Sequence, residues 1–185
     1  DFVITIDPAD ARDFDDAVFV TRDDKGHWTL WVHIADVGYF VPPGGPLDRE
    51  ARRRATSVYL PGRVIPMLPP KLSDDLCSLR PEVPRLTLTC WVELDARGEA
   101  HGAKVEETVI RSWRRFTYEE VQDVLDASGQ VEDLARELHR ELRRVEALDA
   151  LRGAARSRSG RSLSLEDKIQ DATPDNNCKQ RISDD

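Results

Sequence analysis

The chain has 185 residues, of which 39% are hydrophobic and 34% are charged, and its formal net charge is -8. This composition predicts a soluble globular protein, and no apolar run approaches the roughly 18 residues that a membrane-spanning helix requires. The negative charge argues against a simple RNA-binding module with an excess of Lys and Arg, although a metallonuclease remains compatible with it because bound cations neutralise acids that hold metal.

The beginning of the chain predicts a strand followed by a hairpin. Residues 2–6, 17–21 and 27–34 have the apolar character of strands. Residues 23–26, Asp-Asp-Lys-Gly, supply turn residues between the last two of these strands.

Proline-rich segments flank a short basic helix in the next part of the chain. Residues 41–46 hold three prolines and two glycines, so they predict a loop. Residues 47–55 predict a helix whose basic side chains are Arg49, Arg52, Arg53 and Arg54. Residues 59–71 contain four prolines and no periodicity, so we expect an extended loop there.

The second half of the chain predicts another hairpin and then helices. Residues 86–94 alternate between apolar and polar, and a Gly-containing turn leads to a further strand at 103–110. Thr117 and Glu120 have the spacing of a capping box that opens a helix. Leu and Val recur at helical spacing over residues 131–151, which predicts a long amphipathic helix.

Antiparallel hairpins followed by helices predict an α+β fold. We expect one domain over residues 1–156. Residues 157–185 are rich in Ser, Arg, Asp and Asn and have few apolar side chains to bury, so we expect a tail that is loosely ordered or does not belong to the domain's family.

The most informative segment is a cluster of aspartates between the first two strands. Five fall within ten residues: Asp7, Asp10, Asp13, Asp15 and Asp16. Crowded carboxylates repel and raise one another's pKa unless cations lie between them. Mg²⁺ prefers oxygen ligands and keeps part of its water shell, and two such ions about 4 Å apart can assist in-line attack on a phosphodiester. The cluster therefore predicts a divalent metal site for phosphodiester hydrolysis.

Two other interpretations of these aspartates were weighed. Acids in a turn are often merely solvated. A calcium loop of the EF-hand type needs Gly at its sixth position and Glu at its twelfth, and neither is present when the loop is started at Asp10 or Asp13.

Five blocks of sequence point to a known family when they are taken together. They are residues 5–17 (Thr-Ile-Asp-Pro-Ala-Asp-Ala-Arg-Asp-Phe-Asp-Asp-Ala), 32–37 (Val-His-Ile-Ala-Asp-Val), 59–62 (Tyr-Leu-Pro-Gly), 65–69 (Ile-Pro-Met-Leu-Pro) and 72–79 (Leu-Ser-Asp-Asp-Leu-Cys-Ser-Leu). In this order they resemble the RNB catalytic domain of the ribonuclease II/ribonuclease R family. The resemblance covers residues 1–125 and makes residues 1–156 a partial catalytic domain of that type.

The resemblance implies a hydrolytic exoribonuclease that degrades single-stranded RNA in the 3′→5′ direction and releases nucleoside 5′-monophosphates. It implies Mg²⁺ or Mn²⁺ as cofactor. The family's ligand positions correspond to Asp7, Asp13, Asp15 and Asp16, of which Asp15 contributes most to the chemical step. Asp10 has no counterpart among those ligands and is expected to be a turn residue or a supporting acid.

Aromatic side chains are candidates for RNA contact, because bases of single strands stack on them. Tyr59 matches a family tyrosine that packs on the terminal nucleotide, and Tyr118 matches one linked to product length and base stacking. Without the resemblance, Tyr59 is equally a residue at the edge of the core and Tyr118 a packing residue at a helix start. The arginines of residues 47–55 suit phosphate or a solvated helix face.

Two further polar residues lie close in sequence to a predicted strand end. His33 has no partners at metal-ligand spacing, so we expect a structural role for it. Asp36 is a candidate for supporting the acidic site from outside the ligand set.

The resemblance leaves out parts of the family's enzymes. We find no counterpart of the second half of the catalytic domain, which carries an arginine-rich segment that clamps phosphates, or of the flanking RNA-binding β-barrels. An alternative to the enzyme is therefore a catalytically incompetent fragment that binds metal or RNA.

The remaining expectations concern partners and compartment. Cys77, Cys90 and Cys178 are an odd number at wide spacings and fit neither a disulfide framework nor a zinc site. The sequence opens in a strand-like run, so we do not expect secretion. We expect a cytoplasmic monomer that acts on single-stranded RNA and does not associate with membranes.

Overall fold

The computed structural model describes residues 2–126 and residue 147, so the predicted helix at 131–151 and the tail at 157–185 lie outside the described residues, apart from residue 147, which is helical. The chain divides into two units by its contacts. Of the described residues, the first contains 2–19, Val32–Leu88 and 107–126, and the second contains Val20–Trp31 and Thr89–Glu106. The acidic cluster and both candidate tyrosines belong to the first unit.

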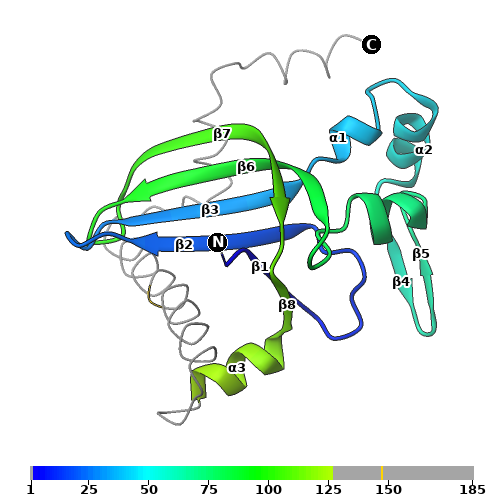
Figure 1. Ribbon diagram of the computed structural model, residues 1–185. Coiled ribbons are helices and arrows are strands. Elements are labelled where there is room, and N and C mark those ends of the chain that lie inside the picture. The colour runs from blue at the N-terminus through cyan, green and yellow to red at the C-terminus, as the bar shows by residue number, and fades with distance from the viewer. Residues whose placement is uncertain (1, 127–146, 148–185) are drawn as a thin grey trace, which may run out of the picture. The chain divides into compact units, whose positions relative to one another are not determined.

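A six-stranded sheet is the main element of the fold, with the strand order β7-β6-β3-β2-β1-β8 (Figure 1). Its strands are β1 (Ile4–Asp7), β2 (Asp16–Arg22), β3 (Trp28–Ala35), β6 (Pro84–Leu94), β7 (Ala100–Arg111) and β8 (Arg114–Thr117). β1 and β2 are antiparallel, with Ile4 opposite Val18. The predicted α+β class and the predicted hairpins are confirmed.

One strand of this sheet was not predicted. β8 lies parallel to β1, and its four residues pair in register from Ile4 with Arg114 to Asp7 with Thr117. The strand escaped prediction because it is short, begins with two arginines and pairs with a segment far away in sequence. It makes the sheet mixed and places Thr117 beside Asp7.

The described helices are short. α1 (Val37–Phe40) follows Asp36, whose Oδ1 accepts a hydrogen bond from the Tyr39 backbone N–H at 3.1 Å. Asp36 is therefore the cap of a helix that was not predicted. The other helical elements are α2 (Pro46–Arg54), which confirms the basic helix, a π-helical turn η1 (Leu72–Leu76) and α3 (Tyr118–Asp126).

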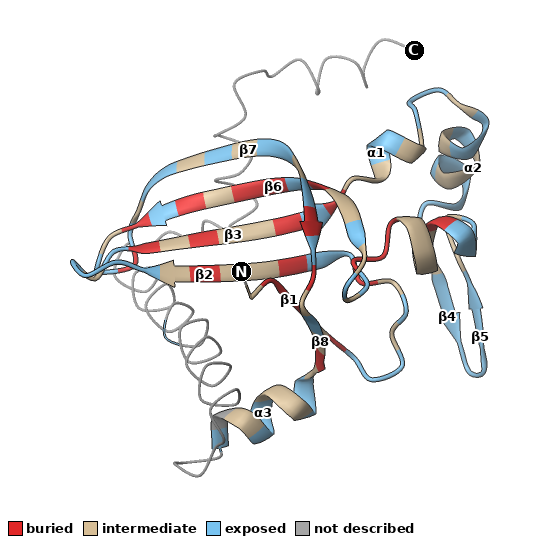
Figure 2. Cartoon of the chain, viewed as in Figure 1, coloured by how far each residue is buried: buried red, intermediate tan, exposed pale blue. Residues whose placement is uncertain are grey.

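The prediction of an extended loop at residues 59–71 is wrong for the first part of that range. β4 (Val58–Leu60) and β5 (Arg63–Ile65) form an antiparallel hairpin, with Leu60 opposite Arg63. Pro61 and Gly62 make its turn, and Gly62 has a φ of +73°, which glycine adopts without steric cost. All six strand residues are exposed (Figure 2). The prolines that suggested a loop therefore mark a tight turn and the end of a strand.

The first unit has a hydrophobic core that includes Phe14, Ala17, Leu72, Cys77 and Leu79. Phe14 comes from the aspartate-rich segment, whereas Leu72, Cys77 and Leu79 come from η1 and the residues after it. The core thus joins the acidic segment to a part of the chain more than fifty residues later. None of the helices among the described residues has the length and apolar character needed to cross a membrane.

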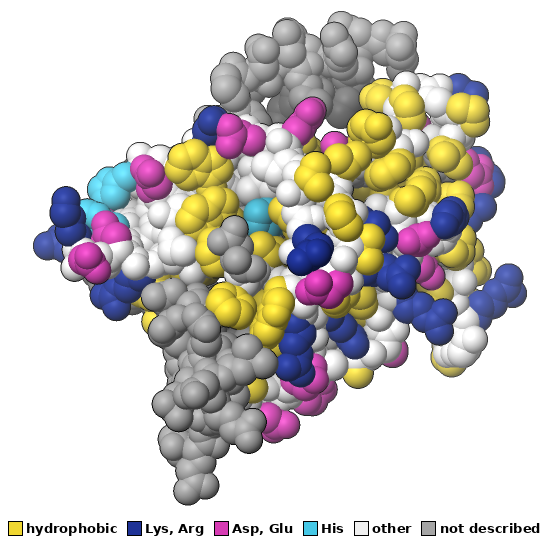
Figure 3. All heavy atoms as spheres, in the orientation of Figure 1, with side chains coloured by type: hydrophobic (Ala, Val, Ile, Leu, Met, Phe, Trp, Pro, Cys, Tyr) yellow, Lys and Arg dark blue, Asp and Glu magenta, His cyan; other side chains and the backbone are white. Residues whose placement is uncertain are grey.

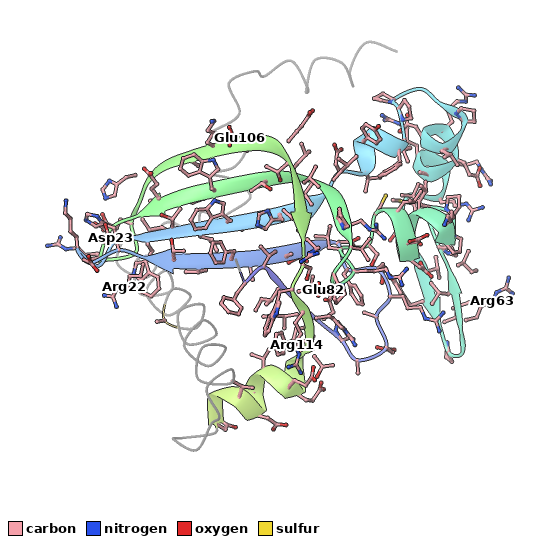
Figure 4. All side chains as sticks on the ribbon, viewed as in Figure 1. Arg22, Asp23, Arg63, Glu82, Glu106 and Arg114 are labelled. Carbon is pink, nitrogen blue, oxygen red and sulfur yellow. The ribbon has the colours of Figure 1, made fainter. Side chains whose placement is uncertain are left out.

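The predicted capping box of α3 is present. The Thr117 N–H donates to Glu120 Oε2 at 2.8 Å, and the Glu120 N–H donates to Thr117 Oγ1 at 3.1 Å. Arg114 also approaches Glu120, at 3.3 Å, from the strand that precedes the helix (Figure 4).

Replacing Thr117 by Ala removes the hydroxyl that accepts the Glu120 N–H. We expect Thr117→Ala to lower the free energy of unfolding by about 1 kcal/mol, whereas Thr117→Ser keeps the cap and changes it little. Urea unfolding of the three proteins tests this. Equal stability of the Ala and Ser variants would show that the cap contributes nothing.

His33 gives a prediction for the pH dependence of stability. Burial lowers the pKa of His33 to about 4 from an ordinary 6.5. Above pH 6.5 the imidazole is neutral in both states, but below it the unfolded chain gains the proton first, so folding loses stability until about pH 4. The free energy of unfolding of the wild type minus that of His33→Gln should fall by about 3 kcal/mol between pH 7 and pH 4. A difference that stays constant over this range would contradict the assignment.

Candidate metal and RNA site

The acidic loop, defined here as residues 7–16, joins β1 to β2 in the first unit. Asp7 is the last residue of β1 and Asp16 the first of β2. Between them, the Ala11 N–H donates to the Pro8 carbonyl at 3.0 Å and closes a turn, while the buried Phe14 ring anchors the loop in the core. The loop therefore returns the chain, and Asp7, Asp13, Asp15 and Asp16 lie near enough to influence one another electrostatically.

The carboxylates of the acidic loop affect one another electrostatically. Asp7 is buried, and this burial raises its pKa, with Asp16 and Asp13 raising it further. Asp15 is exposed at the surface, but partial desolvation by the surrounding protein raises its pKa, and Asp13, Asp16 and Asp7 add to the effect. Desolvation likewise raises the pKa of Asp16. Holding these groups together as carboxylates is unfavourable without a cation, which is the property expected of a metal site.

One atom of the loop lacks a partner although it is buried. Among the described residues, Oδ2 of Asp7 has no partner within hydrogen-bond geometry, although the Thr5 side chain lies near enough to oppose the rise in the pKa of Asp7, and Asp7 as a whole is only 9% exposed. A buried carboxylate oxygen without a donor is costly, and a divalent cation with oxygen ligands would satisfy it. The donor set is all oxygen, so it fits Mg²⁺ or Mn²⁺. Within the part of the chain that the structure describes, however, no three acidic, His or Cys side chains are gathered closely enough to hold one ion.

A cavity lies beside the acidic loop. It is lined by side chains from the loop, from the β4–β5 hairpin and from η1, among them Asp7, Asp10, Asp13, Tyr59, Val64 and Asp74. Tyr59 is 67% exposed, and its hydroxyl donates to Asp13 Oδ2 at 3.3 Å. The carboxylate of Asp13, assisted by burial, raises the pKa of the Tyr59 phenol, so the phenol stays a hydrogen-bond donor. The structure thus brings Tyr59 and three loop aspartates to one cavity.

The other candidates have different positions. Tyr118 is the first residue of α3 and is 58% exposed, next to Thr117, the partner of Asp7 across β1 and β8. It does not line the cavity. His33 is buried in β3, in keeping with a structural role. Asp10 is exposed in the turn of the acidic loop and lines the cavity without belonging to the expected ligand set.

Arginines also project from α2 and from the tip of the β4–β5 hairpin, and several dark blue side chains lie on that side of the molecule (Figure 3). Those of α2 are largely engaged in ion pairs within the helix, Arg52 with Asp48 and both Arg53 and Arg54 with Glu50, at 2.8–3.0 Å. Arg54 also donates to the Pro66 carbonyl at 2.8 Å and so ties the helix to the end of β5. Arg63 projects from the hairpin tip (Figure 4). The α2 arginines are therefore chiefly a solvated helix face.

Arg115 is a contributor to the site that the sequence did not reveal. Its guanidinium donates to the Pro8 carbonyl, lies 5.3 Å from the centre of the Phe14 ring, and opposes the rise in the pKa of Asp7. It comes from β8, the unpredicted strand, so no local signal marked it. Asp74, in η1, adds a fourth carboxylate to the cavity, and its charge contributes to raising the pKa of Tyr59. It belongs to one of the sequence blocks that resemble the family, but nothing in that block marked it as a site residue.

Comparisons with known proteins identify the family. The sequence model of the RNB domain family matches residues 1–184 of this chain. Ribonuclease R of Escherichia coli (strain K12) is 45% identical over 158 residues, which are 85% of this chain and 19% of that protein. Ribonuclease R of Chlamydia trachomatis is 48% identical over 122 residues, or 66% of this chain and 18% of that protein. The chain thus spans about a fifth of the length of these relatives.

Solved structures agree with this match. The structure titled Mycoplasma genitalium RNase R in complex with double-stranded RNA has a TM-score of 0.78 and 33% identity, covering 85% of this chain and 28% of that one. Yeast Ssd1, described as a pseudonuclease, has a TM-score of 0.69 and covers 83% of this chain and 18% of its own, but its 23% identity shows a common fold only. On the sequence match, the shared fold and the aspartate blocks together, the chain belongs to the RNB domain family.

Proposed function

We propose that this chain is the part of a hydrolytic 3′→5′ exoribonuclease that binds divalent metal and acts on single-stranded RNA, releasing nucleoside 5′-monophosphates. The observation that carries the proposal is the buried, unpartnered Asp7 oxygen in a loop of mutually repelling carboxylates beside a cavity with an exposed tyrosine. Membership of the RNB family and its Ribonuclease R relatives supports the same reaction class.

Asp7, Asp13, Asp15 and Asp16 would hold Mg²⁺ or Mn²⁺ in this proposal. A bound pair of divalent ions would activate a water and stabilise the leaving oxygen of the phosphodiester. The protein's part is to present oxygen ligands in a fixed loop. Anchoring of Phe14 in the core and of the Asp15 carbonyl on the Ala35 N–H, at 2.9 Å, supplies that fixation.

The substrate class follows from the cavity beside the loop. Tyr59 presents an exposed ring at the cavity and is tied through its hydroxyl to Asp13, so a base stacked on that ring would lie next to the acidic loop. Mycoplasma genitalium RNase R is described in complex with ribose-methylated single-stranded RNA, which supports RNA as the ligand. Tyr118 would contact RNA outside the cavity. The choice of metal, the end product, the monomeric state and the cytoplasmic location stay predictions.

A metal- or RNA-binding fragment without cleavage is the second candidate. The observation that favours it is that no three acidic, His or Cys side chains are grouped closely enough to hold one ion among the described residues. Fold likeness by itself does not establish catalysis.

Replacement of Asp15 by Asn separates these two candidates. Asp15→Asn keeps the shape of the side chain and removes its charge. We expect it to slow RNA hydrolysis at least about 100-fold, because losing a metal ligand should cost more than losing a group that only supports a ligand. The measurement is a gel time course with 5′-labelled single-stranded RNA in Mg²⁺, and EDTA should abolish shortening from the 3′ end.

Asp24→Asn is the matched control, since Asp24 is an exposed aspartate in the β2–β3 turn. It should degrade RNA at the wild-type rate. Degradation that Asp15→Asn and EDTA leave unchanged would rule out the proposed site. Intact RNA from a folded wild-type chain that binds Mn²⁺ would instead establish the second candidate.

Tyr59 gives a second prediction, measured as RNA affinity with metal chelated. We expect Tyr59→Ala to weaken binding of single-stranded RNA by about 1 to 3 kcal/mol through loss of stacking, while Tyr59→Phe retains most of the affinity. Tyr39→Ala is the control, because Tyr39 is also 67% exposed but lies on α1. Should both Ala variants bind RNA like the wild type, Tyr59 is not a stacking residue.

A further inference from the structure

We propose that Ser78 is the positioning residue of the acidic loop: its buried hydroxyl bridges the backbone on both sides of Asp13 and thereby sets where the loop's carboxylates stand. The inference rests on the proposed function, since it concerns the residues that would hold the metal. Ser78 lies 64 residues after Phe14 in the sequence and is not among the site residues predicted from the sequence.

The bridge consists of two hydrogen bonds to a single oxygen. The Phe14 N–H donates to Ser78 Oγ at 3.1 Å, and Ser78 Oγ donates to the Arg12 carbonyl at 2.8 Å. Asp13 stands between these two residues. The serine thus closes the backbone around Asp13 from the buried side, while Asp13 lines the cavity on the other.

Neighbouring peptide groups extend the same attachment. The Leu79 N–H donates to the Phe14 carbonyl at 2.8 Å, and the Ala35 N–H donates to the Asp15 carbonyl at 2.9 Å. The backbone from Arg12 to Asp15 is therefore held at four polar groups. The Ser78 hydroxyl is the partner of two of these groups. The other two are bound by the backbone N–H groups of Leu79 and Ala35, so Ser78 is the partner that acts through its side chain.

Ser78 is itself held rigidly. It is completely buried, at 0% exposure. Its N–H donates to the Asp75 carbonyl at 3.1 Å, and its carbonyl accepts from Arg85 Nε at 2.8 Å. Arg85 also pairs with the Asp75 carboxylate at 3.1 Å, and only 11% of the Arg85 side chain is exposed. A support fixed in this way transmits little motion to the loop.

A hydroxyl suits this position for a specific reason. It donates and accepts at once, so it satisfies an N–H and a carbonyl two residues apart. Alanine would leave both groups unsatisfied in a buried place, in a loop whose carboxylates repel one another. Relaxation of the loop would move Asp13 and Asp15 apart, and metal sites lose affinity when the groups that orient their ligands are removed.

The test uses the full chain with Ser78→Ala. We expect the Mn²⁺ dissociation constant, measured by electron paramagnetic resonance, to rise about 10-fold or more, and kcat at saturating metal to fall while KM for RNA changes less than about 2-fold. Amide hydrogen exchange should accelerate over residues 12–15. If Ser78 has only a structural role, Ser78→Ala will lower the unfolding temperature. The folded variant will then bind Mn²⁺ as the wild type does, and its kcat will not fall.

Ser112→Ala is the matched control. Ser112 is a serine with 1% exposure whose Oγ lies 3.5 Å from the Val3 carbonyl, at the other end of β1 from the acidic loop. It should bind Mn²⁺ as the wild type does. If Ser78→Ala does not fold, Ser78→Cys replaces it, because a thiol keeps the side chain and weakens both hydrogen bonds; its Mn²⁺ affinity and exchange should then be altered in the same direction.

The outcomes separate the two proposals. Weaker Mn²⁺ binding and faster exchange in the Ser78 variant alone support the positioning role. Wild-type Mn²⁺ affinity and exchange in a folded Ser78 variant, or equal changes in Ser112→Ala, overturn it. If the wild type binds no Mn²⁺, the proposed function fails, and hydrogen exchange over residues 12–15 still decides whether Ser78 holds the loop.

Discussion

Repulsion among the carboxylates of the acidic loop is the constraint on which the site depends. Burial and neighbouring negative charge raise the pKa of Asp7 and Asp15, so an unsupported segment with this sequence would spread its acids into water. The fold opposes this by fixing the backbone of the loop, with Asp7, Asp10 and Asp13 lining the cavity and Asp15 and Asp16 outside its lining. The free energy that holds the acids together therefore comes from groups that are not acidic and do not touch the cavity.

Two kinds of group support the loop from different elements. On one side, Ser78 and Leu79 bind its backbone, and Phe14 belongs to the same hydrophobic core as Leu79 and Cys77. On the other side, Arg115 of β8 binds the Pro8 carbonyl and places a positive charge near Asp7. The first support restrains geometry, and the second also offsets charge. Their combination explains how a short segment can carry so many carboxylates within a folded domain.

Sequence patterns predicted what is local in this fold. The strands around the acidic loop, the turn at residues 23–26 and the capping box of α3 depend on neighbouring residues, and the aspartates themselves are adjacent in sequence. The β4–β5 hairpin was missed because Pro61 suggested a loop, although with Gly62 it forms a tight turn. β8 and the roles of Ser78 and Arg115 depend on pairings 64 or more residues apart, which periodicity and motif spacing do not encode.

The parallel pairing of β1 with β8 has a consequence for the order of folding. The acids lie in the first sixteen residues, but Arg115 reaches the loop from a position 107 residues beyond Pro8. Closing so long a segment is entropically costly and contributes to slow folding. On a ribosome the aspartates would emerge long before their supports, as a flexible acidic segment with no fixed geometry. Assembly of the site is thus coupled to completion of the sheet, so a stalled or prematurely ended chain would carry the aspartates without the arrangement that makes them a site.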